Sequence, residues 1–527
     1  MKKPQIIIPM SGIGRRFLDA GYLEPKPLIV VDGKPIIEHV VNLFDRPNDV
    51  IFICNENHLR ETDMFETLKN ISPNCRIFEV TNKNRKGPVD AVSKIFDEID
   101  NDREVIVSYC DYGTVWSYDN FLNNAREKKS DGSIACYKGF HPHMLGSDNY
   151  AFCRETNNIL EQIKEKEPFT NDRMGEYASN GTYFFKNGKI LKKYFKELID
   201  KDINLKGEYY VSLVYNLLVS DGLKVSIFEI EKMLQWGTPY DLEIYKSWSN
   251  YFKKPKMNRI ATPKNTTLIL PMAGNGSRFT NQGNKIPKPF IPINGKPMVI
   301  NAIEDLPITD KSVFIVRSEH NTDYNISNIL NSHIKNYKVV EIDRLTDGQA
   351  STCEIGLSDI NLDDPIIISA CDNGIYYDTK KCNEMINDES IDVIVWSFRN
   401  NQTSKVNPNS YAWLDVDDNN NIKHVSCKKF IYDDPLKTHA IVGTMFFRKA
   451  KYFIDGLLKN KEHNIRTNNE FYVDDVINQN ILLGLNVKVF EVEDYICWGT
   501  PEDLKTYNYW NEHFKKNYEE KSNYNRN

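Results

Sequence analysis

The sequence has no apolar run long enough to cross a bilayer, since a membrane-spanning helix needs about 20 consecutive apolar residues. The opening segment MKKPQIIIPM holds only a brief apolar stretch that Pro9 interrupts. This stretch is too short for a signal peptide and is predicted to be a strand. The ten cysteines contain no CxxC pair. We therefore expect reduced thiols, a cytoplasmic location and no membrane partner.

An excess of basic charge is also absent. The 67 lysines and arginines and 73 aspartates and glutamates leave a net charge of -6, which argues against a nucleic-acid partner. Hydrophobic residues make up 40% and charged residues 27% of the chain, as in ordinary globular proteins. A chain of 527 residues is too long for one core and predicts roughly three domains of about 150 residues, or two larger ones.

The sequence contains a long internal repeat. Residues 6–17 read IIIPMSGIGRRF and residues 268–279 read LILPMAGNGSRF. Matched residues lie 262 positions apart along both halves, and Asp111 and Asp372 lie 261 apart. The nearly constant offset predicts a tandem pair of whole domains. We assign residues 1–253 and 266–513 to the domains, 254–265 to a linker with two prolines and four charges, and 514–527 to a polar, disordered tail.

Each half alternates predicted strands with predicted helices. QIIIPM and TLILPM are typical of buried strands, and KPIIEHVVNLF and KPMVINAIEDL have the apolar spacing of helices. Further strands, EVIVSYCD and PIIISACD, end at an aspartate. The pattern predicts an α/β fold in each half, with a mostly parallel mixed sheet flanked by helices. Ligands of such Rossmann-like sheets bind at the carboxyl ends of strands, where the glycine segments and both aspartates fall.

The glycine segments GIGRRF and GNGSRF could bring backbone N–H groups close to a phosphate. A GxG after a strand is also compatible with a simple strand-to-helix turn. The dinucleotide fingerprint GxGxxG is excluded because Phe17 and Phe279 occupy the third glycine position, and a Walker A loop is excluded because GK[ST] is missing.

Two cations follow each glycine segment. Arg16 and Arg278 come two residues after the second glycine, and Lys26 and Lys288 lie in the strings PKPLI and PKPFI. Two positive charges so close to a phosphate-binding turn suit a triphosphate.

The combined pattern PMxGxGxRF…PKP[LF]I…GKP resembles the sugar-phosphate nucleotidyltransferases, or nucleotide-sugar pyrophosphorylases. It looks closest to the branch found in bacterial capsule and surface-glycan loci, which includes cytidylyltransferases for small phosphorylated compounds. The resemblance covers both halves nearly end to end. It implies two tandem nucleotidyltransferase domains of the GT-A-like type, which require Mg²⁺.

The resemblance also implies roles for individual residues. Arg16, Lys26, Arg278 and Lys288 would hold the phosphates during catalysis, and Asp111 and Asp372 would bind the metal. The nucleotide would contact Met10, Ser11, Gly12, Gly14 and Gly87 in the first half and Met272, Ala273, Gly274, Gly276 and Gly348 in the second half.

On the acceptor side, the resemblance implies binding by Lys166, Glu208, Lys428 and Glu470. Glu165 also resembles a sugar contact of the family, but the second half has a cysteine at the matching position 427. The two halves differ most on this side. The difference predicts either two different acceptors or one site that has lost its function.

One departure from the family concerns the second metal ligand. Many pyrophosphorylases carry an aspartate two residues before the terminal GTP motif, where this chain has Gln235 and Cys497. Either one carboxylate holds the magnesium together with phosphate oxygens, or Asp241 or Asp503 turns inward.

The predicted reaction joins a nucleoside triphosphate to a sugar phosphate or a small phosphorylated alcohol or amine and releases pyrophosphate. CTP is favoured, then UTP or dTTP, on the resemblance to the capsule branch. A GT-A glycosyltransferase is a weaker alternative because CDYG and CDNG lack the second aspartate of an Asp-x-Asp motif. A third hypothesis makes one half a non-catalytic nucleotide-binding partner of the other. The chain would be a monomer or a homo-oligomer.

Overall fold

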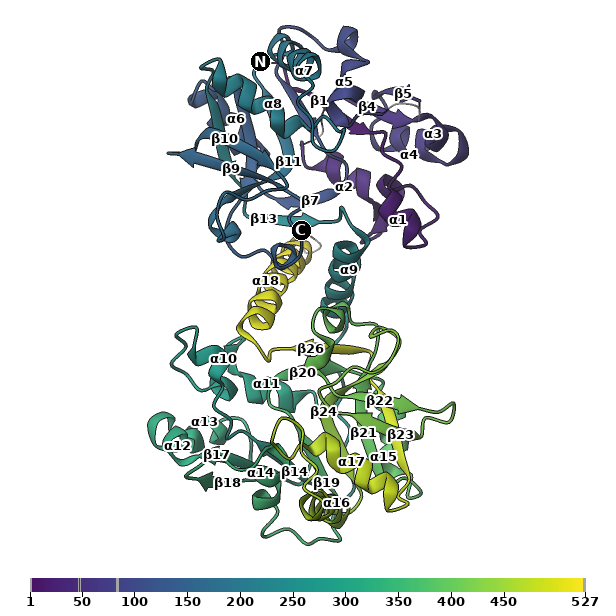
Figure 1. Ribbon diagram of the computed structural model, residues 1–527, viewed down its shortest axis with the longest axis vertical. Coiled ribbons are helices and arrows are strands. Elements are labelled where there is room, and N and C mark those ends of the chain that lie inside the picture. The colour runs from purple at the N-terminus through teal and green to yellow at the C-terminus, as the bar shows by residue number, and fades with distance from the viewer. Residues whose placement is uncertain (1, 46, 48, 82–84, 525–527) are drawn as a thin grey trace. The chain divides into compact units, whose positions relative to one another are not determined.

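A computed structural model describes residues 2–45, 47, 49–81 and 85–524, with side chains as far as residue 515. The chain divides into two compact units, Met1–Asn250 and Tyr251–Asn527. Each unit has sheets and helices of the predicted mixed α/β kind (Figure 1). No helix among the described residues combines the length and apolar character that a bilayer crossing demands.

A nine-stranded sheet forms the centre of the first unit. Its strands are β1 Gln5–Met10, β4 Val50–Asn55, β5 Arg76–Val80, β6 Val105–Ser108, β8 Gly132–Tyr137, β9 Ala151–Thr156, β10 Ile159–Glu165, β11 Tyr177–Phe185 and β12 Val225–Glu229. The order across the sheet is β5-β4-β1-β6-β11-β8-β12-β10-β9. The first four strands are parallel, and β11 runs antiparallel to both of its main neighbours, β6 and β8. The predicted mixed sheet is confirmed.

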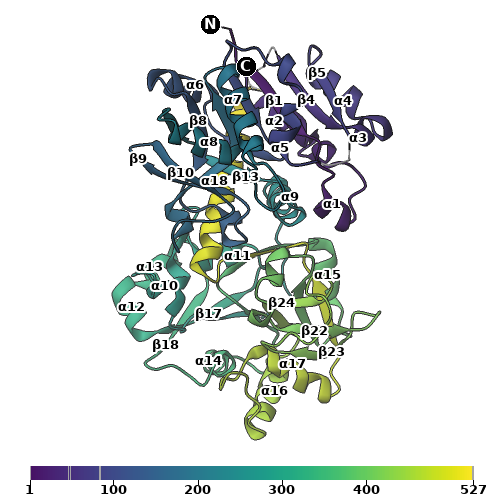
Figure 2. The ribbon, with the colours of Figure 1, turned by 45° about the horizontal axis from the view of Figure 1, so that its top comes forward.

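Helices cover the sheet of the first unit. They are α1 Arg15–Asp19, α2 Ile36–Asn42, α3 Glu56–Glu61, α4 Met64–Ile71, α5 Pro88–Ser93, α6 Tyr118–Glu127, α7 Gly188–Asp200, α8 Val211–Ser220 and α9 Pro239–Lys253. Figure 2 shows α5, α7 and α8 lying together. Val92, Phe195 and Val214 from these helices join Ile7 and Ile51 of the sheet in one buried cluster. The continuous apolar strands form because both of their faces are covered.

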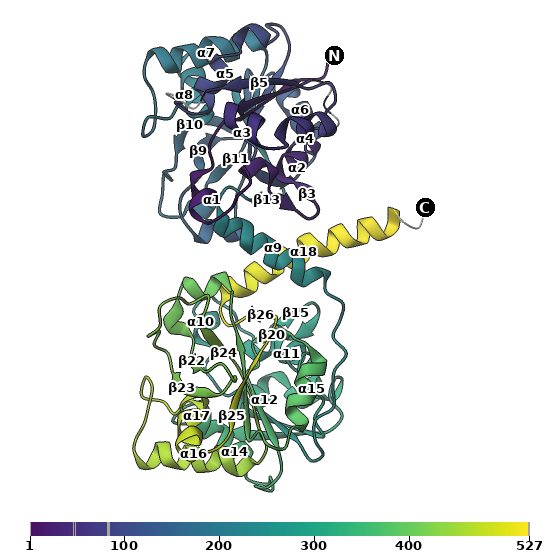
Figure 3. The same cartoon turned by 90° about the vertical axis from the view of Figure 1, so that its right-hand side faces the viewer.

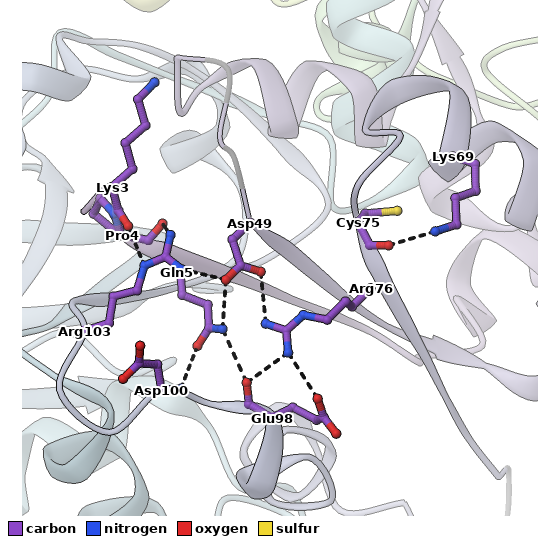
Figure 4. Close-up of polar contacts among 10 residues, drawn as sticks. All are labelled: Lys3, Pro4, Gln5, Asp49, Lys69, Cys75, Arg76, Glu98, Asp100 and Arg103. Carbon is purple, nitrogen blue, oxygen red and sulfur yellow. Dashed lines mark hydrogen bonds and ion pairs between the residues drawn. The ribbon is translucent and has the colours of Figure 1, made fainter.

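A polar network ties together the amino ends of the parallel strands (Figure 4). Asp49, just before β4, receives Arg103 at 2.7 Å and Arg76 at 2.9 Å on its two carboxylate oxygens. Gln5 of β1 donates to the same carboxylate at 3.2 Å, and Arg76 also pairs with Glu98 at 3.1 Å. These polar contacts stabilise the amino-end edge of the sheet. The candidate site forms at the opposite edge, at the carboxyl ends of the strands.

The second unit contains a sheet of the same kind. Its strands are β14 Thr267–Pro271, β17 Lys311–Arg317, β18 Tyr337–Ile342, β19 Ile366–Ser369, β21 Val393–Phe398, β22 Trp413–Val416, β23 Ile422–Ser426, β24 His439–Phe447 and β25 Val487–Glu491. The main path β18-β17-β14-β19-β24-β21-β25 corresponds to β5-β4-β1-β6-β11-β8-β12 of the first unit. β24 is again antiparallel to its neighbours β19 and β21.

Side chains of the second sheet alternate between two buried clusters, as a strand's period of two requires. Ile269 and Ile315 face a cluster with α14, α16 and α17, which lie together in Figure 3. Leu270 and Phe314 face a cluster with α11, α13 and α15. The helices of this unit are α10 Ser277–Thr280, α11 Met298–Glu304, α12 Ser318–Tyr324, α13 Ile326–Asn331, α14 Gln349–Gly356, α15 Thr379–Asn387, α16 Ala450–Glu462, α17 Val473–Leu482 and α18 Pro501–Tyr524.

Short two-stranded ribbons accompany the sheets of both units. β2 Val30–Val31 pairs with β3 Lys34–Pro35, β7 Tyr112–Val115 with β13 Lys232–Gln235, β15 Pro292–Ile293 with β16 Lys296–Pro297, and β20 Asn373–Tyr376 with β26 Asp494–Cys497. The ribbons β7–β13 and β20–β26 join the segment after the candidate metal aspartate to the segment before the WGTP motif.

The segment predicted as a linker, residues 254–265, packs on the second unit. Ala261 forms a β-bridge with Ile308, and Arg259 donates to the carbonyl of Leu306 at 2.8 Å. Met257 also packs against the core of that unit. The apolar residues between the two prolines and four charges therefore attach this segment to the second unit.

The predicted disordered tail, residues 514–527, differs from the structure as far as residue 524. Helix α18 runs on to Tyr524, while residues 525–527 lie outside the described residues. Leu504, Tyr507 and Phe514 are buried and recur at helical spacing. The ring of Phe514 stacks on Phe252 with centroids 5.5 Å apart. Of these three residues, only Phe514 falls within the segment predicted as a tail.

Candidate functional site

A tight turn connects the first strand of each unit to a short helix. Gly14 and Gly276 precede α1 and α10 with φ of 66° and 57°, in the left-handed region that favours glycine. A Cβ on Gly14 would lie 3.7 Å from the Cβ of Lys26, and one on Gly276 would lie 3.3 Å from the Cβ of Lys288. The PKP lysine therefore stands directly against the glycine turn in both units.

The earlier glycines of the two turns, Gly12 and Gly274, are exposed and have no heavy atom within 4 Å of an added Cβ. The space above these residues is open. Met272 and Ala273, which lead into the second turn, are buried. The backbone that leads into the turn is thus packed in the interior, while the turn itself is exposed to solvent. Phosphate binding by main-chain amides would require such an arrangement.

The PKP lysine and the candidate metal aspartate meet in each unit. Lys26, at the start of the short helix Lys26–Leu28, pairs with Asp111 at 2.7 Å between Nζ and Oδ2, and Lys288 pairs with Asp372 in the same way. The side chains of Lys26 and Asp111 are only 18% and 25% exposed. Burial lowers the pKa of Lys26, but the charge of Asp111, its hydrogen bond to the lysine and a contribution from Cys110 together outweigh burial, so this pKa lies above its usual value. The lysine stays protonated.

The WGTP motif lies beside the same aspartates. A Cβ on Gly237 would come within 3.0 Å of Asp111 Oδ2, and one on Gly499 within 3.4 Å of Asp372 Oδ2. Gln235 Oε1 accepts from the Gly237 N–H, and Cys497 Sγ accepts from the Gly499 N–H, both at 3.3 Å. The residues that replace the family's second aspartate therefore hold the backbone that contacts the first one.

The other carboxylates considered as metal ligands bind their own helix ends. Asp241 accepts from Thr238 Oγ1 at 2.6 Å, and burial raises its pKa to about 6. Asp503 accepts from Thr500 Oγ1 at 2.7 Å. Among the side chains that the structure describes, no three His, Cys, Asp or Glu residues are arranged to hold a metal.

A single carboxylate in each unit is compatible with one common mode of Mg²⁺ binding. Magnesium often keeps several waters and binds through one or two carboxylates plus substrate phosphates. Asp111 and Asp372 are hard oxygen donors, each paired with the lysine that stands against the glycine turn, so the donor set is compatible with that mode of binding.

Gly87 and Gly348 have a backbone role that their sequence context did not reveal. Their φ values are 92° and 121°. A Cβ would come within 2.8 Å of the Tyr209 nitrogen in the first unit and 2.6 Å of the Phe471 nitrogen in the second. The Tyr209 N–H donates to Lys86 O at 2.7 Å. These glycines bring the predicted base-reading segment into contact with the segment of the acceptor glutamates. Residues 82–84 of the base-reading segment lie outside the described residues.

Arg85 is a site residue that sequence reasoning missed. It lies two residues before Gly87, and its guanidinium donates to the carbonyl of Ser11 in the glycine turn. Burial lowers the pKa of Arg85, while the charge of Glu208 raises it. The second unit has Thr346 at the matching position. A lone arginine in a divergent loop carries no motif, so only the fold could reveal it.

The predicted acceptor residues come together in the first unit. Lys166 Nζ donates to the Tyr210 hydroxyl at 2.6 Å, and this hydroxyl donates to Glu208. Lys166 has a φ of 58° and its counterpart Lys428 a φ of 53°, in a region that non-glycine residues seldom occupy. Repeated strain at matching positions is a hint of function.

The acceptor side of the second unit is arranged differently. Lys428 donates to the Ser410 carbonyl and lies 5.7 Å from the ring centre of Tyr472. Glu470 is exposed beside Tyr472 and helps to raise the pKa of that phenol, after burial. The lysine and glutamate positions are thus retained, but their polar contacts are not.

A cleft of about 940 Å³ unites the site of the first unit. Its walls include all the site residues predicted for this half, namely Met10, Ser11, Gly12, Gly14, Arg16, Lys26, Gly87, Asp111, Lys166 and Glu208. Arg16 is exposed, and its charge opposes the raised pKa of Lys26, so the two cations lie near each other. Arg278 is exposed at the matching position of α10.

Comparison with known proteins finds similarities for the first part of the chain. Residues 6–208 match the sequence profile of the family described as "Nucleotidyl transferase". The "Bifunctional protein GlmU" of Buchnera aphidicola subsp. Baizongia pistaciae is 24% identical over 229 residues, which are 43% of this chain and 47% of that protein. The protein of the same name from Staphylococcus epidermidis is 24% identical over 228 residues, 42% of this chain and 47% of its own length.

The chain thus spans about half the length of the curated relatives it matches. Among solved structures, the nucleoside-diphosphate-sugar pyrophosphorylase from Vibrio cholerae is 22% identical, with a TM-score of 0.39 over 46% of this chain and 99% of that one. Residues 6–208 of this chain are therefore similar to the nucleotidyltransferase family.

Proposed function

We propose that each unit is a nucleotidyltransferase that joins a nucleoside triphosphate to a phosphorylated small molecule. The acceptor is a sugar phosphate or a phosphorylated alcohol or amine, and the products are an NDP-linked compound and pyrophosphate. CTP is the favoured nucleotide, then UTP or dTTP, and the product serves capsule or surface-glycan synthesis. These finer assignments rest on the resemblance of the PMxGxGxRF pattern to the capsule branch. With two such units the chain is bifunctional.

The observation that supports the proposal most is the pairing of the PKP lysine with the strand-end aspartate against the glycine turn. It occurs between Lys26 and Asp111 and again between Lys288 and Asp372. In the first unit the pair lines a cleft large enough for a nucleotide and an acceptor. A structural ion pair would not need open backbone glycines beside it.

The chemistry follows from the charges of these residues. A phosphate oxygen of the acceptor attacks the α-phosphorus, and a new P–O bond forms there. The bond from the α-phosphorus to the bridging oxygen breaks, and pyrophosphate departs with the electron pair. The attacking oxygen is already anionic, so no side chain has to remove a proton from it. Arg16 and the protonated Lys26 orient the phosphates and offset the growing charge.

Mg²⁺ would be held by Asp111 in the first unit and by Asp372 in the second. When bound, this ion supplies positive charge to the phosphate oxygens and helps to orient them. The lysine that now pairs with each aspartate lies within reach of the same oxygens. Each unit then has a cationic wall facing the triphosphate.

The test measures pyrophosphate release by the full chain over a matrix of nucleoside triphosphates and phosphorylated metabolites. Asp111→Ala and Asp372→Ala should each abolish the activity of their own unit, and Lys26→Ala and Lys288→Ala should do the same. Asp200→Ala, an exposed carboxylate that pairs with Lys196 at 2.5 Å, is the matched control and should be neutral. Unchanged rates in both single aspartate variants and in the double variant would contradict the proposed site.

A further inference from the structure

The acceptor ends of the two units are built on the same strand–helix pairing. In the first unit, the side chain of Asn216 on α8 accepts from the N–H of Ile163 and donates to its carbonyl, both at 2.9 Å. In the second unit, Asn478 on α17 makes the same two bonds with Val425, at 2.8 and 2.9 Å. The strand therefore has the same register against the helix in both units, and side chains near it can be compared position by position.

Two residues after Ile163 and Val425, the units differ in which element supplies a carboxylate. In the first unit Glu165 on the strand accepts from Ser212 Oγ on the helix at 2.6 Å. In the second unit the residue that matches Glu165 is Cys427, directly after strand β23, and the helix residue is Asp474, whose carboxylate accepts from the thiol at 3.8 Å. The pair of positions is the same in both units, but the carboxylate comes from the opposite element.

The environment of the carboxylate is also retained. Burial raises the pKa of Glu165, and burial raises the pKa of Asp474 to about 6. In each case the lysine in the left-handed conformation, Lys166 or Lys428, opposes that shift. Both carboxylates remain half-buried and so reachable. Glu165 lines the cleft of the first unit.

We propose that Asp474 binds the acceptor in the second unit, in the place that Glu165 occupies in the first. This inference rests on the proposed function. A carboxylate accepts hydrogen bonds and donates none, so its partner on the acceptor is a hydroxyl or ammonium group. A thiol is a weak donor, and Cys427 leaves Asp474 able to accept from such a group. The second site keeps its acceptor carboxylate, and the cysteine in its lysine motif is not a mark of lost function.

The surrounding wall sets the two acceptors apart. Tyr109, Asn180 and Tyr183 line the cleft of the first unit, and the matching positions in the second unit are Ala370, Val442 and Met445. Three polar or aromatic side chains are replaced by apolar ones, and Ala370 is much smaller than Tyr109. The second unit therefore takes a phosphorylated acceptor with the same donor group near Asp474 but different substituents.

The test uses the full chain with Asp111→Ala and Lys166→Ala, which confine turnover and acceptor binding to the second unit. Calorimetry compares glycerol 3-phosphate and glucose 1-phosphate with orthophosphate, which has no carbon-borne hydroxyl. Asp474→Asn should weaken binding of the hydroxylated probes by about tenfold to a hundredfold, the worth of one hydrogen bond to a charged group. Orthophosphate binding should be unchanged. The acceptor KM should rise with little change in kcat.

Two further variants separate binding from folding. Asp475→Asn changes the neighbouring buried carboxylate, which accepts from Thr467 Oγ1 at 2.9 Å, and should leave probe binding intact. The exchange Cys427→Glu with Asp474→Ser recreates the arrangement of the first unit and should restore binding, which a merely structural role for Asp474 would not allow.

The outcomes distinguish the two proposals. Equal binding of the hydroxylated probes before and after Asp474→Asn, or no binding of any probe, overturns the assignment of Asp474. If the unaltered second unit binds these probes but releases no pyrophosphate with any triphosphate, the proposed function of that unit fails while the assignment of Asp474 stands.

Discussion

The close approach at Gly87 offers the sharpest test of the structure. We consider Gly87→Ala, which adds one methyl group where the Gly87 segment meets the backbone of Tyr209. The new Cβ would lie 2.8 Å from the nitrogen and 2.9 Å from the oxygen of Tyr209. Both atoms are backbone atoms, and both make hydrogen bonds to the Gly87 segment. Neither can move without breaking these bonds.

Two costs combine in this variant. The backbone of Gly87 has φ of 92° and ψ of -176°, a region that is essentially restricted to glycine and costs another residue about 1–3 kcal/mol. The steric overlap adds about 1–3 kcal/mol, as overpacking of a filled site does. We therefore expect the first unit to lose about 2–6 kcal/mol of folding free energy, a large part of the usual 5–15 kcal/mol.

Gly33→Ala is the matched control. Gly33 has a φ of 82° but no heavy atom within 4 Å of an added Cβ, so only backbone strain of about 1–2 kcal/mol applies. Scanning calorimetry of the full chain measures the transition of the first unit, which should fall by roughly 2–4 °C per kcal/mol in a unit of this size. A Gly87→Ala transition no lower than that of Gly33→Ala would refute the close approach.

Two other predictions concern single side chains. Burial raises the pKa of Asp305 to about 7; since the unfolded value is lower, the second unit should lose stability as pH rises from about 4 to about 8, by up to about 4 kcal/mol. Asp305→Asn should flatten this decline in a pH series of thermal unfolding, and an equally steep decline would contradict it. Arg85→Met should raise the nucleotide KM of the first unit about tenfold through loss of its bond to Ser11, without affecting the second unit. Arg60→Met, an exposed control at 64%, should leave KM unchanged, and equal KM values in both variants would remove Arg85 from the site.

The α/β fold and much of the first site could be predicted from short strings of residues. A glycine turn, a PKP lysine and a strand-end aspartate each follow a recognisable strand or precede a helix, so their positions along the sheet edge follow from the parallel strand order. This is why Gly12, Lys26 and Asp111 line one cleft. Their catalytic and binding roles stay predictions.

Residues without a motif escaped prediction because their role depends on contacts between distant segments. Arg85 reaches Ser11 across 74 positions of the chain. Asp474 pairs with Cys427 across 47 positions, and neither residue matches the family's lysine-glutamate pattern. Likewise, the sequence around Gly348 reveals the glycine, but it does not reveal that the backbone of Phe471 lies against it.

The segments at the ends of the units pack more closely than their composition indicates. Residues 254–265 have the prolines and charges of a free linker, yet Ala261 pairs with Ile308. Composition averages over a window, whereas packing depends on whether a few apolar side chains find a surface. The same reason explains how α18 continues beyond Phe514.

Sequence by itself determined the internal repeat, the alternation of strands and helices, and the order of the glycine, lysine and aspartate motifs, because each depends on residues close together in the chain. Tertiary structure alone decided that Lys26 pairs with Asp111, that Gly87 meets Tyr209, and that Asp474 pairs with Cys427. Those arrangements depend on which strands become neighbours, and that choice is made by burial of the whole apolar surface and not by any local segment.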